Sequence, residues 1–122
     1  MTALKKTCIS ALAFFASLSL SACRSPFVQT SIVNHTGSKV QLIEVDYPSA
    51  SFGTQQIDDN ATYHYHFQIR DSGSVKITYT DAGNKVHTLT GPTLTQGQHG
   101  TLTITLDGNG EVTWAPQLTT SH

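Results

Sequence analysis

Cysteine is almost absent from this chain, and its scarcity excludes several kinds of chemistry. Only Cys8 and Cys23 occur among the 122 residues, and no cysteine follows residue 23. The rest of the chain therefore offers no disulfide, no thiolate metal site and no cysteine nucleophile. A core of apolar side chains must stabilise the fold without covalent links.

Charged residues are also scarce, and the chain has no cationic run. Lys and Arg number 7 and Asp and Glu number 8, which gives a formal net charge of −1 with neutral histidines. Residues 23–122 exclude Lys5 and Lys6, so their balance is 5 − 8 = −3. A mildly acidic domain has no long-range attraction for phosphate backbones. We therefore expect no nucleic acid partner.

A hydrophobic run long enough to cross a bilayer is absent as well. The main apolar run, residues 9–20, is shorter than the ~20 residues that a spanning helix needs. Lys5 and Lys6 precede this run, and the small residues Ser21 and Ala22 follow it. A positive start, a short apolar run and small residues are typical of a secretory signal peptide. We predict that residues 1–22 are such a peptide and are removed.

The residues at the end of this leader form a more specific motif. Leu20-Ser21-Ala22-Cys23 resembles the lipobox of bacterial lipoprotein precursors. The resemblance implies that the leader is cut before Cys23, that the Cys23 thiol is lipidated, and that the lipid holds the protein to a membrane of the bacterial cell envelope. Arg24 resembles the outer-membrane type if the host is Gram-negative, because an aspartate after the cysteine usually means inner-membrane retention. In residues 23–26, the three residues after Cys23 would form a tether of at most ~10 Å, at ~3.4 Å per residue.

From residue 27 onward the sequence alternates apolar and polar residues and shows no sustained helical period. This pattern predicts β-strands at Val28–Asn34, at residues 39–47 with a β-bulge near Leu42, and at residues 52–57 on a sheet edge. Seven or eight such strands, with turns about every ten residues, favour an all-β fold. We expect one antiparallel two-sheet β-sandwich, immunoglobulin-like or transthyretin-like, over residues 27–116. A small barrel is the alternative.

The alternation also predicts how one group of strands pairs. Residues 63–70 and 74–79 would form a hairpin about a loop at residues 71–73, with Phe67 opposite Ile77. The following turn would then place Thr78 opposite His87.

A second hairpin is expected near the C-terminus, about the turn Gly108-Asn109-Gly110. It would pair Leu106 with Val112 and Ile104 with Trp114. Proline has no N–H to donate to a ladder, so we expect Pro116 to end the last strand. Residues 117–122 would then be a flexible tail.

The histidines are the first candidate site. His64 and His66 share one face of a predicted strand, ~6.7 Å apart at ~3.3 Å per residue. By the predicted register His87 lies on the same face, two strands away. Imidazoles at such spacing can bind zinc or copper. The simpler interpretation is that these histidines belong to a polar sheet face in contact with water. A histidine metal site is the alternative. No motif indicates any other cofactor.

Aromatic side chains offer a second candidate site. Tyr63, Tyr65 and Trp114 are expected to point inward, whereas Tyr47 and Phe52 flank the loop that contains Pro48. Loops on a rigid sandwich often carry binding residues. We therefore predict residues 47–53 as a candidate binding loop, with Tyr47 and Phe52 exposed.

The sequence gives little support for an enzyme. It contains no Gly-x-Ser-x-Gly motif, and a small sandwich with short loops has little room for a cleft. We expect a non-enzymatic, lipid-anchored envelope protein with a binding or structural role at the membrane surface, where it would contact another envelope protein or a cell-wall component. A histidine-based metal-binding module is the alternative, and a small hydrolase is less favoured.

Overall fold

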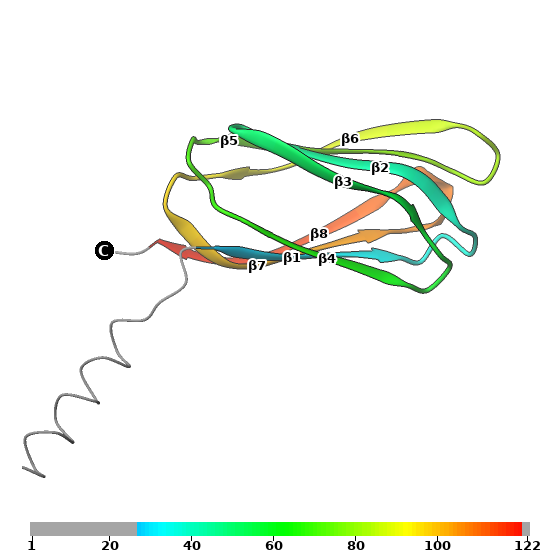
Figure 1. The fold of residues 1–122 in the computed structure, drawn as a ribbon, viewed down its shortest axis with the longest axis horizontal. Coiled ribbons are helices and arrows are strands. Elements are labelled where there is room, and N and C mark those ends of the chain that lie inside the picture. The colour runs from blue at the N-terminus through cyan, green and yellow to red at the C-terminus, as the bar shows by residue number, and fades with distance from the viewer. Residues whose placement is uncertain (1–26, 121–122) are drawn as a thin grey trace, which may run out of the picture.

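The computed structural model describes residues 27–120, which form two stacked β-sheets (Figure 1). The predicted signal peptide, residues 1–22, and the predicted anchor segment, residues 23–26, lie outside the described residues. The strands are β1 (Val28–Asn34), β2 (Val40–Tyr47), β3 (Ala50–Ile57), β4 (Thr62–Phe67), β5 (Gly73–Thr80), β6 (Val86–Leu94), β7 (Gln98–Leu106) and β8 (Val112–Thr120), and a 3₁₀ turn, η1 (Gly108–Gly110), joins the last two.

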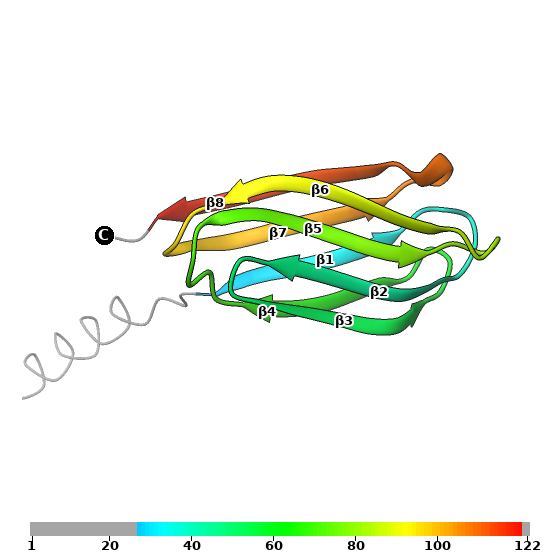
Figure 2. The ribbon, with the colours of Figure 1, turned by 90° about the horizontal axis from the view of Figure 1, so that it is seen from above.

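Each sheet contains four strands, and Figure 2 shows one sheet lying over the other. Sheet A has the order β4-β1-β7-β8, and sheet B has the order β3-β2-β5-β6. Strands β1 and β7 pair in parallel, and the other neighbours are antiparallel. In an immunoglobulin sandwich the first strand pairs with the second, whereas here β1 lies between β4 and β7. The all-β sandwich is therefore confirmed, and its two four-stranded sheets agree with the transthyretin-like alternative.

The core lies between the sheets and follows from the alternation of the sequence. In β1, for example, Val28, Thr30, Ile32 and Asn34 are buried, whereas the residues between them are more exposed. Successive side chains of a strand point to opposite faces, so each strand contributes one row of residues to the core. Sixteen apolar side chains are buried among the described residues. Burial of apolar surface of this kind stabilises the fold by ~25 cal/mol per Å².

Several sequence predictions are confirmed. The bounds of β1 are as predicted, and β3 lies at the edge of sheet B. The β7–β8 hairpin pairs Leu106 with Val112 and Ile104 with Trp114 in the predicted register. The pairing of β2 with β5 shifts between Gln41 and Glu44, which confirms the predicted bulge.

The predicted hairpin between β4 and β5 is wrong. Strand β4 pairs with β1 in sheet A, and β5 pairs with β2 and β6 in sheet B. Residues 68–72 cross from one sheet to the other, and Ile69 is buried in the core on the way. Phe67 and Ile77 are both buried, as expected, but they belong to opposite sheets.

The predicted end of the last strand at Pro116 is also wrong. Strand β8 continues to Thr120, and residues 117–120 pair with the first part of β7. The reason is that β8 is an edge strand, where a proline can point the side without an N–H away from the ladder. The predicted flexible tail is therefore strand over residues 117–120, and residues 121–122 lie outside the described residues.

The two ends of the sandwich carry different turns (Figure 1). At the N-terminal end, β1 begins beside the turn at residues 48–49, the crossing at residues 68–72 and the turn at residues 95–97. At the far end, β1 finishes at Asn34, near the other four turns. No helix in the described part of the chain is long and apolar enough to span a bilayer.

Candidate functional site

A pocket of about 460 Å³ lies at the far end of the sandwich. Three turns enclose it: Thr36 and Ser38 come from the β1–β2 turn, the β5–β6 hairpin supplies a second wall, and the β7–β8 turn supplies a third. The short loops therefore do form a concavity, contrary to the expectation from their length. A hollow of about 630 Å³ over the β2 bulge is larger, but Glu44 is the one charged side chain in its lining.

The β5–β6 hairpin is organised by the side chain of Asp81. The backbone N–H of Asp81 donates to Lys85 O at 2.9 Å, and Asn84 completes the turn with a φ of +64°. Carboxylate oxygen Oδ1 of Asp81 accepts hydrogen bonds from the backbone N–H groups of Gly83 (2.9 Å) and Lys85 (3.0 Å). Aspartate and asparagine suit such turns because short polar side chains bond nearby backbone and tolerate a left-handed conformation. The second carboxylate oxygen of Asp81, Oδ2, faces His87 on β6.

His87 fills the position opposite this carboxylate. Its Nε2 lies 2.7 Å from Asp81 Oδ2, and its ring stacks on Tyr79 with 4.9 Å between centroids. Gly110, at a φ of +77°, closes the other side of the ring, because a Cβ there would lie 2.7 Å from His87 Nδ1. The histidine side chain is only 14% exposed. Backbone and side-chain contacts therefore fix the imidazole in one orientation.

The electrostatics of the pocket follow from these contacts. The hydrogen bond from His87, supported by the backbone N–H of Lys85, holds the pKa of Asp81 below its ordinary value. Burial raises the pKa of Tyr79, and the negative charges of Asp81 and Asp107 raise it further. The pocket thus presents two carboxylates and the ammonium group of Lys85 around a neutral phenol. Such a lining suits a small polar group with hydrogen-bond donors better than an apolar ligand.

Comparison with known proteins assigns this chain to no family. No family model matches the sequence, and no curated protein or solved structure is significantly similar to it. The case for a function therefore rests on the residues themselves.

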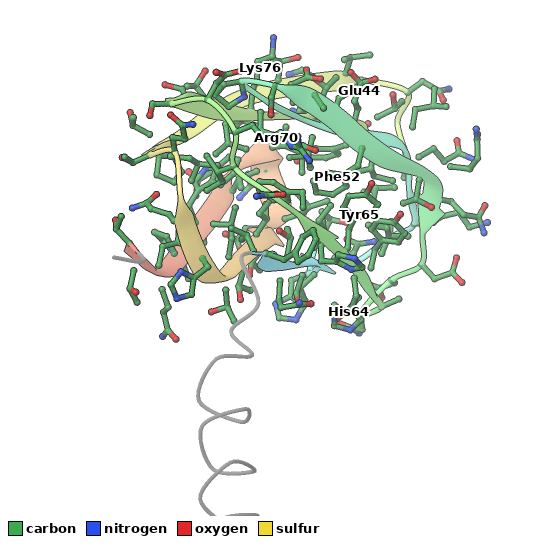
Figure 3. All side chains as sticks on the ribbon, turned by 60° about the vertical axis from the view of Figure 1, so that its left-hand side comes forward. Glu44, Phe52, His64, Tyr65, Arg70 and Lys76 are labelled. Carbon is green, nitrogen blue, oxygen red and sulfur yellow. The ribbon has the colours of Figure 1, made fainter. Side chains whose placement is uncertain are left out.

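The predicted binding loop is not found. A two-residue turn, Pro48-Ser49, joins β2 to β3, and Tyr47 pairs with Ala50 across it. Phe52 is only 7% exposed and stacks on Tyr65, with 4.2 Å between ring centroids. Figure 3 shows Phe52 between the sheets, next to Tyr65. The prediction that Phe52 is exposed is wrong because Phe52 lies within β3 and pairs with the buried Val45 of β2, which places both side chains on the core face.

Tyr47 and Tyr65 also differ from their predicted positions. Tyr47 is half-buried, and its ring stacks on that of Phe67 at 4.2 Å between centroids. Tyr65 was expected inside but is 39% exposed, because β4 is an edge strand and leaves one side of the ring open. Burial and the neighbouring Tyr65 raise the pKa of Tyr47, which opposes ionisation of its hydroxyl.

The three predicted metal-ligating histidines are not brought together. His64 and His66 lie on β4 in sheet A, whereas His87 lies on β6 in sheet B, near the opposite side of the sandwich. His64 Nδ1 lies 3.0 Å from Ser31 Oγ, and the His66 ring packs edge-on against Phe27 at 5.2 Å. Their expected common face depended on the β4–β5 hairpin, which does not form. Within residues 27–120, no cluster of three or more His, Cys, Asp or Glu side chains could hold a metal ion.

The Asp81–His87 pair was missed by sequence reasoning because the turn contains one more residue than predicted. Thr80 pairs with Val86 rather than with residue 85, so His87 faces Tyr79 instead of Thr78. The sequence signal for the longer turn was the run Asp81-Ala82-Gly83-Asn84-Lys85, because a leading aspartate can bond the backbone of its own turn. In the structure the Asp81 side chain accepts two such backbone N–H groups.

We expect Asp81→Asn to lower the free energy of unfolding at neutral pH. The lowered pKa of Asp81 means that its contribution is fully present above the ordinary aspartate pKa of ~3.9 and is lost as the pH falls through the lower folded-state pKa. The difference from the wild type should therefore shrink below about pH 4. Urea unfolding measured across this pH range tests the expectation, with Asp59→Asn as the control because Asp59 is exposed in a turn at the same end. A difference that stayed constant down to low pH would contradict it.

Proposed function

We propose that this protein is a lipid-anchored lipoprotein of the bacterial cell envelope, attached through Cys23. In a Gram-negative host, Arg24 favours the outer membrane. We further propose that its sandwich is non-enzymatic and binds an envelope protein or a cell-wall component through the far-end pocket. The support for the anchor is the motif Leu20-Ser21-Ala22-Cys23, which follows an apolar leader directly.

The observation that carries the binding proposal is the position of the pocket relative to the start of the domain. β1 begins close after Cys23 and ends at the far end, and its six residue steps span ~20 Å at ~3.3 Å each. The pocket therefore opens at the end opposite to the attachment. A protein held by its N-terminus would present this pocket away from its own membrane.

The chemistry of the pocket supports binding rather than catalysis. An Asp–His pair is part of many catalytic triads, but the histidine there must also reach a nucleophile. In this pocket His87 Nε2 is directed at Asp81 and Nδ1 faces Gly110 with no space for another group. The pair therefore fixes the shape of the pocket wall.

Cys23→Ala is expected to abolish lipid attachment and to move the protein from the membrane to the soluble fraction. Metabolic labelling with a radioactive fatty acid and fractionation of the cells measure both effects. Cys8→Ala is the matched control, because Cys8 lies within the predicted leader and should leave both results unchanged. A Cys23→Ala protein that stayed membrane-bound would refute the anchor.

The binding role is tested in the same cells with a photo-crosslinking residue. At Ala82, on the rim of the pocket, it should capture a partner, whereas at the exposed Gln55 on β3 it should not. Equal products at both positions would argue against the pocket as the contact.

A further inference from the structure

We infer that the N-terminal end of the sandwich rests on the phospholipid headgroup layer, with Phe27 as its main apolar contact. This inference rests on the proposed attachment through Cys23 and adds the orientation of the domain to it. Three features support it: the exposed ring at this end, the distribution of charge between the two ends, and the length of chain between Cys23 and β1.

The first feature is the placement of Phe27. Its side chain is 37% exposed, and it is one of few large apolar side chains among residues 27–120 with such exposure. The backbone O of Phe27 accepts a hydrogen bond from Gly100 N at 3.4 Å, and its ring packs against the His66 ring. These contacts hold the ring directly before the first residue of β1. Moving an exposed apolar ring from water into the boundary between lipid headgroups and acyl chains is favourable, because apolar surface leaves water.

The second feature is the difference in charge between the ends. The turns at the N-terminal end, residues 48–49, 68–72 and 95–97, carry only Arg70 and Asp71, so their net charge is zero. The far-end turns carry two lysines and five carboxylates, which gives 2 − 5 = −3. These residues are Lys39, Lys85, Asp58, Asp59, Asp81, Asp107 and Glu111. An anionic lipid surface repels negative charge over about one Debye length, so it favours contact with the neutral end.

The third feature is the reach of the tether. The four steps from Cys23 to Phe27 extend at most ~14 Å at ~3.4 Å per residue. The far end, at Asn34, lies seven residue steps from Phe27, or ~23 Å at ~3.3 Å each. The far end therefore cannot touch the bilayer while Cys23 remains in it, unless the domain lies on its side. Together with the charges, this geometry favours an upright domain.

The test uses the full lipidated protein in vesicles of phosphatidylethanolamine and phosphatidylglycerol. A fluorophore that shifts to shorter wavelength in lipid is attached through Ser49→Cys at the N-terminal end or through Ala82→Cys at the far end. Both positions are exposed turn residues, and residues 27–120 contain no other cysteine. We expect a shift with Ser49→Cys and none with Ala82→Cys. Phe27→Ser should abolish the Ser49→Cys shift, whereas Val86→Ser, which removes a 62% exposed side chain at the far end, should keep it.

Each outcome separates the orientation from the anchor. A protein that floats with the vesicles but shows no shift at either position overturns the orientation and leaves the anchor intact. Shifts at both positions overturn the upright orientation in favour of a domain lying on its side. A protein that is made with Cys23 intact and does not float with vesicles refutes the proposed attachment itself. The wild-type comparison of the two labels does not alter Phe27, so it remains informative even if Phe27→Ser is unstable.

Discussion

Replacing Asn34 by alanine is expected to lower the free energy of unfolding by about 3–5 kcal/mol. Asn34 is fully buried at the end of β1. Its Nδ2 donates to the carbonyl oxygens of Ser38 (2.8 Å), Ile57 (2.9 Å) and Asp58 (3.1 Å), and its Oδ1 accepts from the N–H (3.0 Å) and hydroxyl (2.7 Å) of Thr36. One side chain thus joins the β1–β2 turn to the end of β3. Alanine would leave the buried carbonyl of Ile57 and the partly buried groups of Asp58 and Thr36 without this partner. A buried polar group left unpaired costs about 1–3 kcal/mol.

Urea unfolding of Asn34→Ala measures this loss, and Gln29→Ala is the matched control. Gln29 carries a similar amide on the same strand but is exposed, so its removal should change stability by no more than about 0.5 kcal/mol. Asn34→Asp sharpens the test, because it keeps the acceptor oxygens and replaces the Nδ2 donor, which now faces three carbonyl oxygens, with a charged oxygen. We expect it to be as destabilising as alanine at neutral pH. A cost below about 1 kcal/mol for Asn34→Ala would show that the far end does not depend on this side chain.

Gly100→Ala is expected to cost about 2–4 kcal/mol, from two causes. Gly100 has a φ of +135°, where an L side chain is strained, and an added Cβ would lie 2.2 Å from the backbone O of Gln117 on β8. That oxygen belongs to the neighbouring strand, so the last part of β8 must move away. We therefore expect the loss to be concentrated in residues 117–120, which pair with the beginning of β7.

Gly97→Ala separates the two causes. Gly97 also has a positive φ, +86°, but a Cβ there meets nothing within 4 Å, so this variant carries the backbone strain without the clash. Amide hydrogen exchange should show faster exchange at Gln117 and Thr119, whose N–H groups face β7, in Gly100→Ala than in Gly97→Ala. Equal exchange in the two variants would mean that strand β8 does not pack against Gly100 as described.

The sequence was sufficient where a short turn joins two strands of the same sheet. The turn Gly108-Asn109-Gly110 is short enough that the strands on either side of it must pair as a hairpin. The alternation of apolar and polar residues in both strands then set the β7–β8 register. The bulge in β2 was also visible, because the apolar phase slips by one residue. Leu42 takes up the extra residue with a φ of +52° and a side chain 61% exposed.

Alternation could not decide which strands are neighbours. It shows which side chains face the core, and in a sandwich the strands of both sheets face the same core. Phe67 and Ile77 would be buried whether β4 and β5 pair or lie in opposite sheets, so the pattern was equally consistent with the hairpin that does not form. Without the hairpin, the predicted histidine face does not form. Phe52 is not exposed because its pairing with Val45 turns it toward the core.

The far-end pocket could not be predicted from the sequence for a related reason. Its walls come from turns that are distant in the chain, and their meeting depends on the order of strands in both sheets. Even the local pair of Asp81 and His87 depended on the length of one turn. The sequence did reveal the net charge of −3 over residues 23–122, but not that most of the carboxylates line the far-end turns.

The parallel pairing of β1 with β7 also sets the order in which the protein can fold. Val28 pairs with Gly100, 72 residues further along the chain, and its nearer partner Phe67 is 39 residues away. Contacts between such distant residues form slowly, because a long loop must close first. The first strand to leave a ribosome or a membrane channel is therefore among the last to find both of its neighbours. For the proposed export, this means that the sheet containing β1 is completed only after residues 98–106 have also crossed.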